Sequence, residues 1–598
     1  MTLPPRSAVV HEHTWNRESV FATPDGWQKE LEAVKGVLAE VKKYPGHLGD
    51  SPDVLADWLE LVHETENRVT VLYLYATMEQ SVDTTNQDAA AMMSQVRSLQ
   101  GEAQAASAFA EPEILSLRRE KLDGWMKQHK RLALYAHYFD DLFRLEKYTR
   151  SGEVEAVLGL LADPFGNVTT TYGLLNNADL PFEAARTGSD EELPVAQSTI
   201  TTLMSNPDRE IRRTSYEHYN QGYLTFKNTF ASLLATSVKQ DVFMAKVRGF
   251  DSALEASLYQ NNIPRSVYDN LIETYKNNLP TWHRYWRVRR KALGYDTLRP
   301  YDFWAPLTNQ PHVTFEQAVN WISEGMQPLG EAYVSAVRKG CLEDRWVDIY
   351  PNQGKRAGAF SFGAHGTHPF IFMSFANTLQ SMSTLAHELG HSMHSYLSRQ
   401  HQPIVYGRYT LFAAEVASNF NQAMTRAYLL QHNPDPQFQI AVIEEAMSNF
   451  LRYFFIMPTL ARFELEVHTW AEKGKGLTAD AMIKLMAELF AEGYGGEVDF
   501  DHDSVGITWA QFGHLYSAFY VYQYATGISA AHALADGILT GKTSAVDNYL
   551  KFLSAGGSLY PIDALKMAGV DMSQPEAVTR TFEILASYVD RLEDLTAR

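Results

Sequence analysis

The sequence has little cysteine, lacks long apolar runs and carries no excess of positive charge. Its one cysteine in 598 residues, Cys341, cannot form an internal disulfide, which excludes a disulfide-rich secreted scaffold. No run of 18 or more apolar residues occurs, and the first residues hold no apolar signal segment, so we predict a soluble cytoplasmic protein without a membrane partner. The net charge of −19 argues against a nucleic-acid partner, because nucleic-acid binding normally needs a basic face.

The residues that are abundant predict a large and mainly helical protein. Hydrophobic residues make up 45% of the chain and aromatic residues 12%, which is enough for a large core. The length predicts either two to four domains or one large helical body with lobes. Apolar residues such as Trp27 and Leu31 recur at the three-to-four spacing of a buried helix face along 25–44, 89–120 and 123–148. The fold class that we predict is predominantly α-helical.

Residues 175–197 interrupt the helical pattern. They contain two prolines, an acidic run and little periodicity, which is typical of a domain boundary or an exposed loop. Ser205 and Asn206 then look like helix caps, with Pro207 in the first turn of the following helix. We therefore predict an N-terminal helical lobe over 1–199 and a second domain over 200–598.

A second interruption, at residues 356–375, predicts the clearest β structure of the chain. Two aromatic-rich runs flank a centre that is rich in Gly, Thr and Pro, which is typical of two strands joined by the loop 363–369. This small β hairpin ends about ten residues before the histidine-rich motif described next. Its edge can pair with an extended peptide through backbone hydrogen bonds, or it can be a purely structural hairpin.

The stretch "TLAHELGHSMHSY" contains a candidate metal site. His387 and His391 are four residues apart, so on a helix both imidazoles project from one face and can converge on one ion. Glu388 is turned about 100° from His387 and can reach a water on that ion. The pattern H-E-x-x-H is the signature of zinc peptidases, but it arises by chance in roughly one chain in twenty or thirty of this composition. The motif therefore needs support from elsewhere in the sequence.

A catalytic zinc site needs a third protein ligand and an open position. Glu415, in the helical stretch "LFAAEVASNFNQAM", follows His391 by 24 residues, with a Pro and a Gly between them that allow the chain to return on a second helix. His394 is a competing ligand on the same face, although reaching the ion across two turns is strained; otherwise it has a supporting or packing role. His365 and His368, in the hairpin loop, are expected to face substrate rather than metal.

An aromatic segment lies far downstream, at residues 509–527. It contains His514 and four tyrosines, at positions 516, 520, 522 and 524. Phenol and imidazole donors can stabilise the oxyanion that forms in peptide hydrolysis. The same composition is also typical of an aromatic core helix, so both interpretations stay open. The density of hydroxyl groups favours partners for them, because a buried tyrosine O–H needs one.

Four motifs in order give the chain a resemblance to a known family. "AHELGHSMHSYL", "FAAEVAS", "FGHLYSAFYVYQYATG" and "GGSLYPIDALKMAGVDM" resemble the oligoendopeptidase F group of the thimet-oligopeptidase family of zinc metallopeptidases. The N-terminal "TWNRESVFATPDGWQKELEAV" and the stretch "GKRAGAFSFG" are also similar, so the resemblance covers nearly the whole chain. It implies two helical lobes around a deep substrate channel that excludes folded proteins, with the residues from 200 onward as the catalytic domain.

The resemblance also implies a chemistry and a set of roles. The expected activity is endopeptidic hydrolysis of short peptides with one Zn²⁺ per chain. The expected zinc ligands are His387, His391 and Glu415, and the expected general base is Glu388. The substrate carbonyl would be contacted by residues of the downstream segment: His514, Tyr522 as the best match and Tyr516 as the second.

One position departs from the family pattern. A second glutamate usually follows the third ligand by seven residues, and here that position is Gln422, which can accept a hydrogen bond from a histidine more weakly. Two alternatives to an endopeptidase remain: a peptidyl-dipeptidase or carboxypeptidase with a cation such as Arg399, Arg408 or Arg452 for the substrate C-terminus, or a non-catalytic metal-stabilised peptide-binding protein. The sequence does not determine the cleavage preference or whether the chain is a monomer or a homodimer.

Overall fold

The computed structural model describes residues 3–187 and 192–597. Within these ranges the chain is predominantly α-helical, and its β structure is limited to one two-stranded and one three-stranded sheet, which confirms the predicted fold class. The helical periodicity of 25–44 is confirmed in detail: helix α1 (Pro24–Val41) buries Trp27, Leu31 and Leu38, and the side chain of Thr23 caps its first turn. No helix of the described residues is long and apolar enough to cross a membrane.

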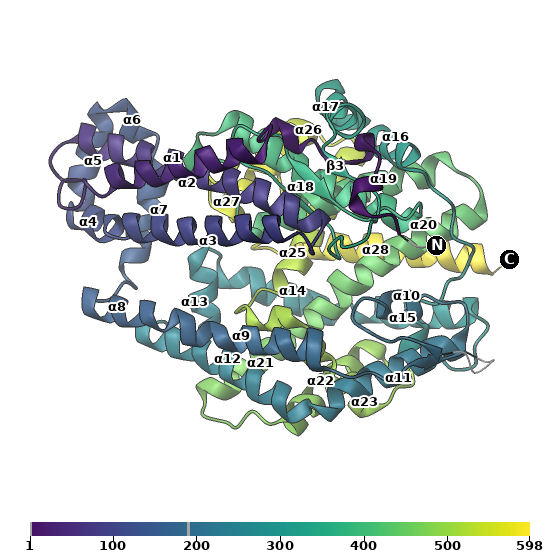
Figure 1. Ribbon diagram of the computed structural model, residues 1–598. Coiled ribbons are helices and arrows are strands. Elements are labelled where there is room, and N and C mark those ends of the chain that lie inside the picture. Colours follow the sequence, from purple (N-terminus) through teal and green to yellow (C-terminus); the bar gives the residue numbers. More distant parts are fainter. Residues whose placement is uncertain (1–2, 188–191, 598) are drawn as a thin grey trace.

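The first seven helices lie in the upper half of the molecule as Figure 1 shows it, beside helices from the second half of the chain. Helix α2, the longest of them, packs on both α1 and α3. After α1, their bounds are α2 (Pro52–Val82), α3 (Gln87–Ser107), α4 (Ala110–Ser116), α5 (Arg119–Gln128), α6 (Lys130–Ala133) and α7 (Ala136–Glu146).

The chain then enters the lower half of Figure 1, where α8, α9, α11 and α12 lie. The side chain of Asp208 caps α11 and accepts from the Glu210 amide, so the prediction of Ser205 and Asn206 as caps was wrong and Pro207 precedes the helix. These helices are α8 (Gly152–Leu160), α9 (Ala162–Leu174), α10 (Ile200–Met204), α11 (Arg209–Thr225), α12 (Lys227–Arg248), α13 (Ala253–Gln260), α14 (Arg265–Asn277) and α15 (Leu279–Ala292).

The remaining helices build the centre and contribute to both halves. One large apolar core runs through them and reaches from α9 to α28. Their bounds are α16 (Phe315–Gly325), α17 (Glu331–Leu342), α18 (Leu379–His401), α19 (Leu411–His432), α20 (Pro436–Leu451), α21 (Met457–Glu472), α22 (Ala479–Tyr494), α23 (His502–Gly506), α24 (Thr508–Gln511), α25 (Tyr522–Leu539), α26 (Ala545–Ala555), α27 (Pro561–Ala568) and α28 (Glu576–Thr596).

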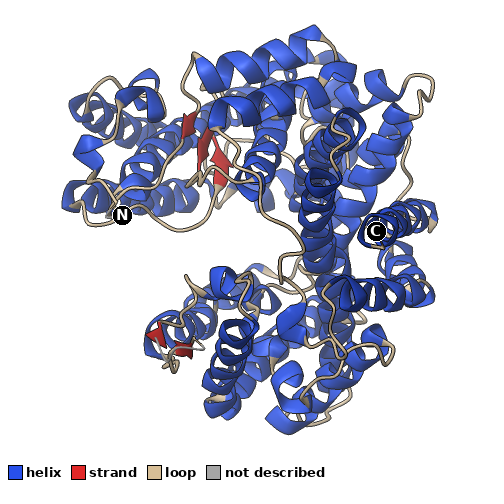
Figure 2. Cartoon of the chain, turned by 90° about the vertical axis from the view of Figure 1, so that its right-hand side faces the viewer, coloured by secondary structure: helices blue, strands red, loops and turns tan. Residues whose placement is uncertain are grey.

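The predicted hairpin is present beside α18. Strands β4 (Phe360–Phe362) and β5 (Phe370–Phe372) are antiparallel, with Phe360 opposite Phe372. A third strand, β3 (Val347–Asp348), pairs with β5 in parallel and was not predicted, because a two-residue strand shows no periodicity. Figure 2 shows this sheet in the upper of two helical halves.

The segment 175–197 is more ordered than the predicted loop. It begins with a π-helical turn at Leu175–Asp179. Strands β1 (Ala185–Arg186) and β2 (Glu192–Leu193) then form the two-stranded sheet, and the connecting residues 188–191 lie outside the described residues.

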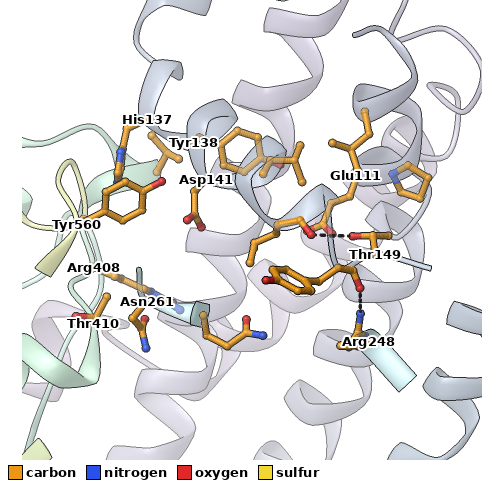
Figure 3. A pocket seen from close by; sticks show the side chains of 18 of the residues that line it. Glu111, His137, Tyr138, Asp141, Thr149, Arg248, Asn261, Arg408, Thr410 and Tyr560 are labelled. Atoms are coloured by element: carbon orange, nitrogen blue, oxygen red, sulfur yellow. Dashed lines mark hydrogen bonds between the residues drawn. The ribbon is translucent and has the colours of Figure 1, made fainter. Parts of the chain in front are cut away.

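A cavity of about 810 Å³ lies where the two halves meet. Its walls come from α4 and α7 above, from the region of Arg248 below, and from the loop that leads into α19. Figure 3 shows the polar side chains around it, including Glu111, Asp141 and Arg408. Tyr409 also lines the cavity, and its hydroxyl donates to the carbonyl oxygen of His391 at 3.3 Å, so the cavity adjoins the histidine-rich helix.

Candidate metal centre and active site

Helices α18 and α19 carry the candidate metal ligands, and a glycine sets their distance. Gly390 lies between His387 and His391 on α18. A Cβ atom at position 390 would lie 2.5 Å from the Cα of Ser418 on α19, which is too close for any other residue. The absence of this side chain lets the two backbones touch, and it brings Glu415 opposite the two histidines.

The three predicted ligands form a cluster. One ligand atom from each of His387, His391 and Glu415 lies within 4.8 Å of the others. The Nε2 atoms of the two histidines are 3.2 Å apart, and Nε2 of His387 is 3.4 Å from Oε2 of Glu415. Two imidazole nitrogens and one carboxylate oxygen that converge in this way can hold a divalent transition-metal ion and leave a position open. The donor set therefore fits zinc.

The outer ring nitrogens of both histidines have fixed partners. Nδ1 of His387 donates to Oε1 of Gln422 at 3.2 Å, so the glutamine takes the place of the expected acid. His391 bonds the backbone of Ala414, and burial lowers its pKa to about 4. Both contacts leave the inner nitrogens as lone-pair donors, which is the form that binds a metal.

Glu388 lies beside the cluster and is buried, with only 6% of the residue exposed. Burial raises its pKa to about 7; nearby His387 opposes the shift, and Glu415 adds to it. The backbone of Ser361 on β4 also opposes the shift, which places this strand of the hairpin close to the carboxyl group. Its Oε2 has no hydrogen-bond partner among the described residues. A carboxyl group with a pKa near neutrality and one free oxygen is suited to proton transfer.

The other histidines of the region lie outside the cluster. His394 stacks on Tyr409 with ring centroids 3.6 Å apart and an angle of 3°, and it is 1% exposed, so its role is packing. His368 lies against Trp346. His365 lies in the hairpin loop, where its amide donates to Oδ1 of Asn67.

Part of the downstream aromatic segment joins the site. Tyr520 and Tyr524 share a hydrogen bond of 2.8 Å between their hydroxyls. His514, in the 3₁₀ turn η9 (Gly513–Tyr516), stacks on Tyr520 and meets Tyr524 edge-on. Its Nδ1 is buried and without a partner in the described part of the chain, and burial followed by the charge of Arg452 lowers its pKa.

Tyr524 faces the third ligand because of a second glycine. A Cβ at Gly527 on α25 would lie 2.7 Å from Cβ of Glu415, so α25 touches α19 at this ligand. Tyr524 precedes Gly527 by three residues and therefore lies on the same face of α25. Consistently, burial and then neighbouring groups that include Glu415 raise the pKa values of Tyr520 and Tyr524.

The structure does not bring the two tyrosines that were chosen from the sequence to this cluster. Tyr522 is 1% exposed and packs against Tyr268 and Phe412 in the core. Burial raises its pKa, with a further contribution from Glu464. Tyr516 packs on Tyr172, with ring centroids 4.5 Å apart. Both fit the aromatic-core interpretation that the sequence left open, whereas His514 lies beside Tyr520 and Tyr524.

Tyr453, which lies beside Tyr524, was not predicted from the sequence. Tyr453 stacks on Tyr524 with centroids 5.2 Å apart and an angle of 7°, and burial followed by the charge of Glu415 raises its pKa to about 12. It lies in the π-helical turn η8 (Arg452–Ile456), which ends two residues before Pro458 in the first turn of α21. Proline has no N–H for an ordinary helical bond, so "FFIMP" was the available signal for an irregular helix at this point.

Comparison with known proteins assigns the family. The family model for peptidase family M3 matches residues 202–584, and the one for oligopeptidase F matches 113–182. The chain is 38% identical to oligopeptidase PepF of Bacillus subtilis (strain 168) over 595 residues, which cover 99% of this chain and 88% of that protein. The chain belongs to peptidase family M3.

Solved structures agree with this assignment. A putative peptidase from Chlamydophila abortus superposes with a TM-score of 0.88 at 31% identity, covering 99% of this chain and all of that one. Oligoendopeptidase F from Enterococcus faecium superposes with a TM-score of 0.75 at 30% identity, covering 96% and 99%. The protein is therefore a metallo-oligopeptidase, a hydrolase that acts on peptides, in a zinc-dependent family. This confirms the predicted resemblance and enzyme class.

Proposed function

We propose that the protein is an oligoendopeptidase that holds one zinc ion between His387, His391 and Glu415. The observation that carries the proposal is the convergence of the three ligand atoms within 4.8 Å, beside a buried carboxyl group with a free oxygen. When bound, zinc would supply Lewis-acid chemistry, since it acidifies a water molecule and polarises the scissile carbonyl.

Glu388 would act as the general base. It would take a proton from the attacking water through its free Oε2 and then pass that proton to the leaving amine. The burial of Glu388, together with the nearby amide of Ser361, would limit the movement of the carboxyl group during both transfers. The hairpin strand that carries this amide would also offer an edge to an extended peptide.

The oxyanion would be stabilised by Tyr524, with Tyr520 and His514 behind it. Two hydroxyls that share one hydrogen bond have one remaining proton to donate to a substrate. Tyr453 fixes the ring of Tyr524 by stacking, which keeps the donor in place before substrate arrives. This proposal replaces Tyr522 and Tyr516, which pack in the core.

We also propose a division of the chain and a location. The family M3 match begins at residue 202, which supports an N-terminal lobe over 1–199 and a catalytic domain over 200–598. The cavity between the halves would admit short peptides and exclude folded proteins. A single buried cysteine suits the reducing cytoplasm.

The test is digestion of a mixture of short peptides by the purified protein, read by mass spectrometry. We expect internal cleavage that a chelator abolishes and added zinc restores, with one zinc per chain by elemental analysis. Paired peptides with free and amidated C-termini should be cut equally. Cleavage only of the free form, two residues or one residue from the C-terminus, would instead identify a peptidyl-dipeptidase or a carboxypeptidase; no cleavage by the zinc-loaded protein would refute the peptidase role.

A further inference from the structure

We propose that Ser383 and Glu445 are positioning residues for the metal ligand His387 and that they act through Gln422. The proposal rests on the proposed zinc site, and it assigns to a distant carboxylate the work of the acid that is missing at position 422. Glu445 lies on α20, which contributes no ligand to the cluster.

A continuous chain of hydrogen bonds joins these residues. Nδ1 of His387 donates to Oε1 of Gln422 at 3.2 Å, and Nε2 of Gln422 donates to Oγ of Ser383 at 2.8 Å. Oγ of Ser383 then donates to Oε1 of Glu445. Arg426 closes the chain, because its Nε and Nη2 donate to the two oxygens of Glu445 at 2.6 and 2.8 Å.

The chemistry of the groups fixes the direction of every bond. An ionised carboxylate accepts only, so Ser383 must give its one proton to Glu445 and can only accept from Gln422. The amide of Gln422 therefore turns its NH₂ toward the serine and its carbonyl toward His387. A carbonyl oxygen also accepts only, so His387 must carry its proton on Nδ1. The chain thereby sets the tautomer in which Nε2 is free to bind the metal.

Burial makes this chain effective. Ser383, Gln422, Arg426 and Glu445 are each less than about a tenth exposed, at 2%, 5%, 1% and 7%. In such surroundings successive hydrogen bonds polarise one another, so the charge of Glu445 can make Ser383, and through it Gln422, a stronger acceptor for the hydrogen bond from His387. Arg426 holds Glu445 through both carboxylate oxygens, and it shares Oε1 with the hydroxyl of Ser383.

Helix geometry explains why the hydrogen bonds connect these particular residues. Ser383 precedes His387 by one turn on α18, and Gln422 precedes Arg426 by one turn on α19. Gln422 can therefore bridge from the metal ligand to the serine, and Arg426 reaches the same carboxylate from the next turn. The carboxylate itself is supplied by a third helix.

The sharpest test is a double-mutant cycle on Ser383 and Gln422, read as the zinc dissociation constant in competition with a chromogenic chelator. Ser383→Ala interrupts the series of hydrogen bonds between Gln422 and Glu445 and leaves the Arg426–Glu445 ion pair intact. Gln422→Glu places a carboxylate directly on His387 and cannot donate to the serine, so it makes the rest of the chain unnecessary. We expect Ser383→Ala to weaken zinc binding about tenfold in the wild-type background and less than about twofold in the Gln422→Glu background.

Ser398→Ala is the matched control, because Ser398 is a buried serine on the same helix whose hydroxyl bonds Gly407 and not the chain. It should leave the zinc dissociation constant within about twofold of wild type. Ser383→Cys, which keeps the volume and weakens both hydrogen bonds, should give an intermediate loss and serves if the alanine variant does not fold.

Two outcomes would overturn the proposal. One is a Ser383→Ala protein that binds zinc as tightly as wild type; the other is an equal loss in both backgrounds, since this would make the serine a packing residue only. Melting temperatures of the metal-free variants are compared with that of the metal-free wild type. A large decrease indicates misfolding, whereas an unchanged value with weaker zinc binding indicates that the positioning of His387 is lost. A wild-type chain that binds no zinc at His387 would refute the proposed function itself, which is a distinguishable result.

Discussion

Replacing Tyr524 by phenylalanine should remove the principal oxyanion donor and leave the site otherwise unchanged. The hydroxyls of Tyr520 and Tyr524 share one hydrogen bond, so the pair has one proton free for substrate. The loss of one such donor costs about 3 kcal/mol in the transition state, or about 10²–10³ in kcat. KM should change little, because this interaction forms only as charge develops on the carbonyl. Steady-state kinetics on a fluorogenic peptide, at equal zinc occupancy, measures both constants.

Tyr522→Phe is the matched control for Tyr524→Phe. It removes the same atom from the same helix, but the Tyr522 ring lies between Tyr268 and Phe412, away from the metal ligands. Its kcat should stay within about twofold of wild type, while Tyr520→Phe should give a smaller loss than Tyr524→Phe because it leaves the Tyr524 hydroxyl free to donate. A normal kcat in Tyr524→Phe, or a large loss in Tyr522→Phe, would refute this assignment of the two tyrosines.

Three further predictions concern the base, a helix contact and acid stability. Glu388→Gln should keep zinc, measured by elemental analysis, and lose about 10²–10⁴ in kcat; full activity would exclude it as the base. Gly390→Ala should destabilise the fold by about 1–3 kcal/mol in denaturant unfolding and weaken zinc binding, because its methyl group meets Ser418; unchanged values would exclude the close contact. Burial lowers the pKa of His532 to about 4 from 6.5, so the unfolded chain takes up a proton first as the pH falls through this window, and about 3 kcal/mol of stability should be lost. Comparing the unfolding free energies of wild type and His532→Gln at pH 7 and pH 4 tests this, and an equal loss in both would contradict it.

The convergence of the three proposed metal ligands could be predicted from the sequence because each part of their geometry is local. The spacing of His387 and His391 is one helical turn, and Glu415 lies on the next helix of a close-packed pair. The core face of α1 was predictable for the same reason. The hairpin was predictable from its aromatic strands, whereas the two-residue strand β3 is held by its partner β5 and has no pattern of its own.

The tyrosines could not be ranked from sequence because the backbone between 512 and 521 is irregular. The chain passes through the turn η9 and a left-handed Phe519, with φ of 52°, before α25 begins at Tyr522. Helical periodicity therefore applies only from Tyr522 onward, and Tyr524 is the residue that shares a face with Gly527. Likewise, Glu445 reaches Ser383 across 62 positions, and no local pattern records such a contact.

Two glycines allow α19 to touch both the helix that carries the proposed histidine ligands and the helix that carries Tyr524, the proposed oxyanion donor. Gly390 lets α18 touch α19 at Ser418, and Gly527 lets α25 touch α19 at Glu415 itself. Glu415 is thus held between the helix that carries the other two ligands and the helix that carries Tyr524. A side chain at Gly390 would push α18 away from α19, and one at Gly527 would push α25 away from α19. Either displacement would be larger than the geometry of a metal site tolerates. The relative placement of the proposed ligands, base and oxyanion donor therefore depends on close backbone contacts between helices, and the side chains need only their ordinary helical directions to converge.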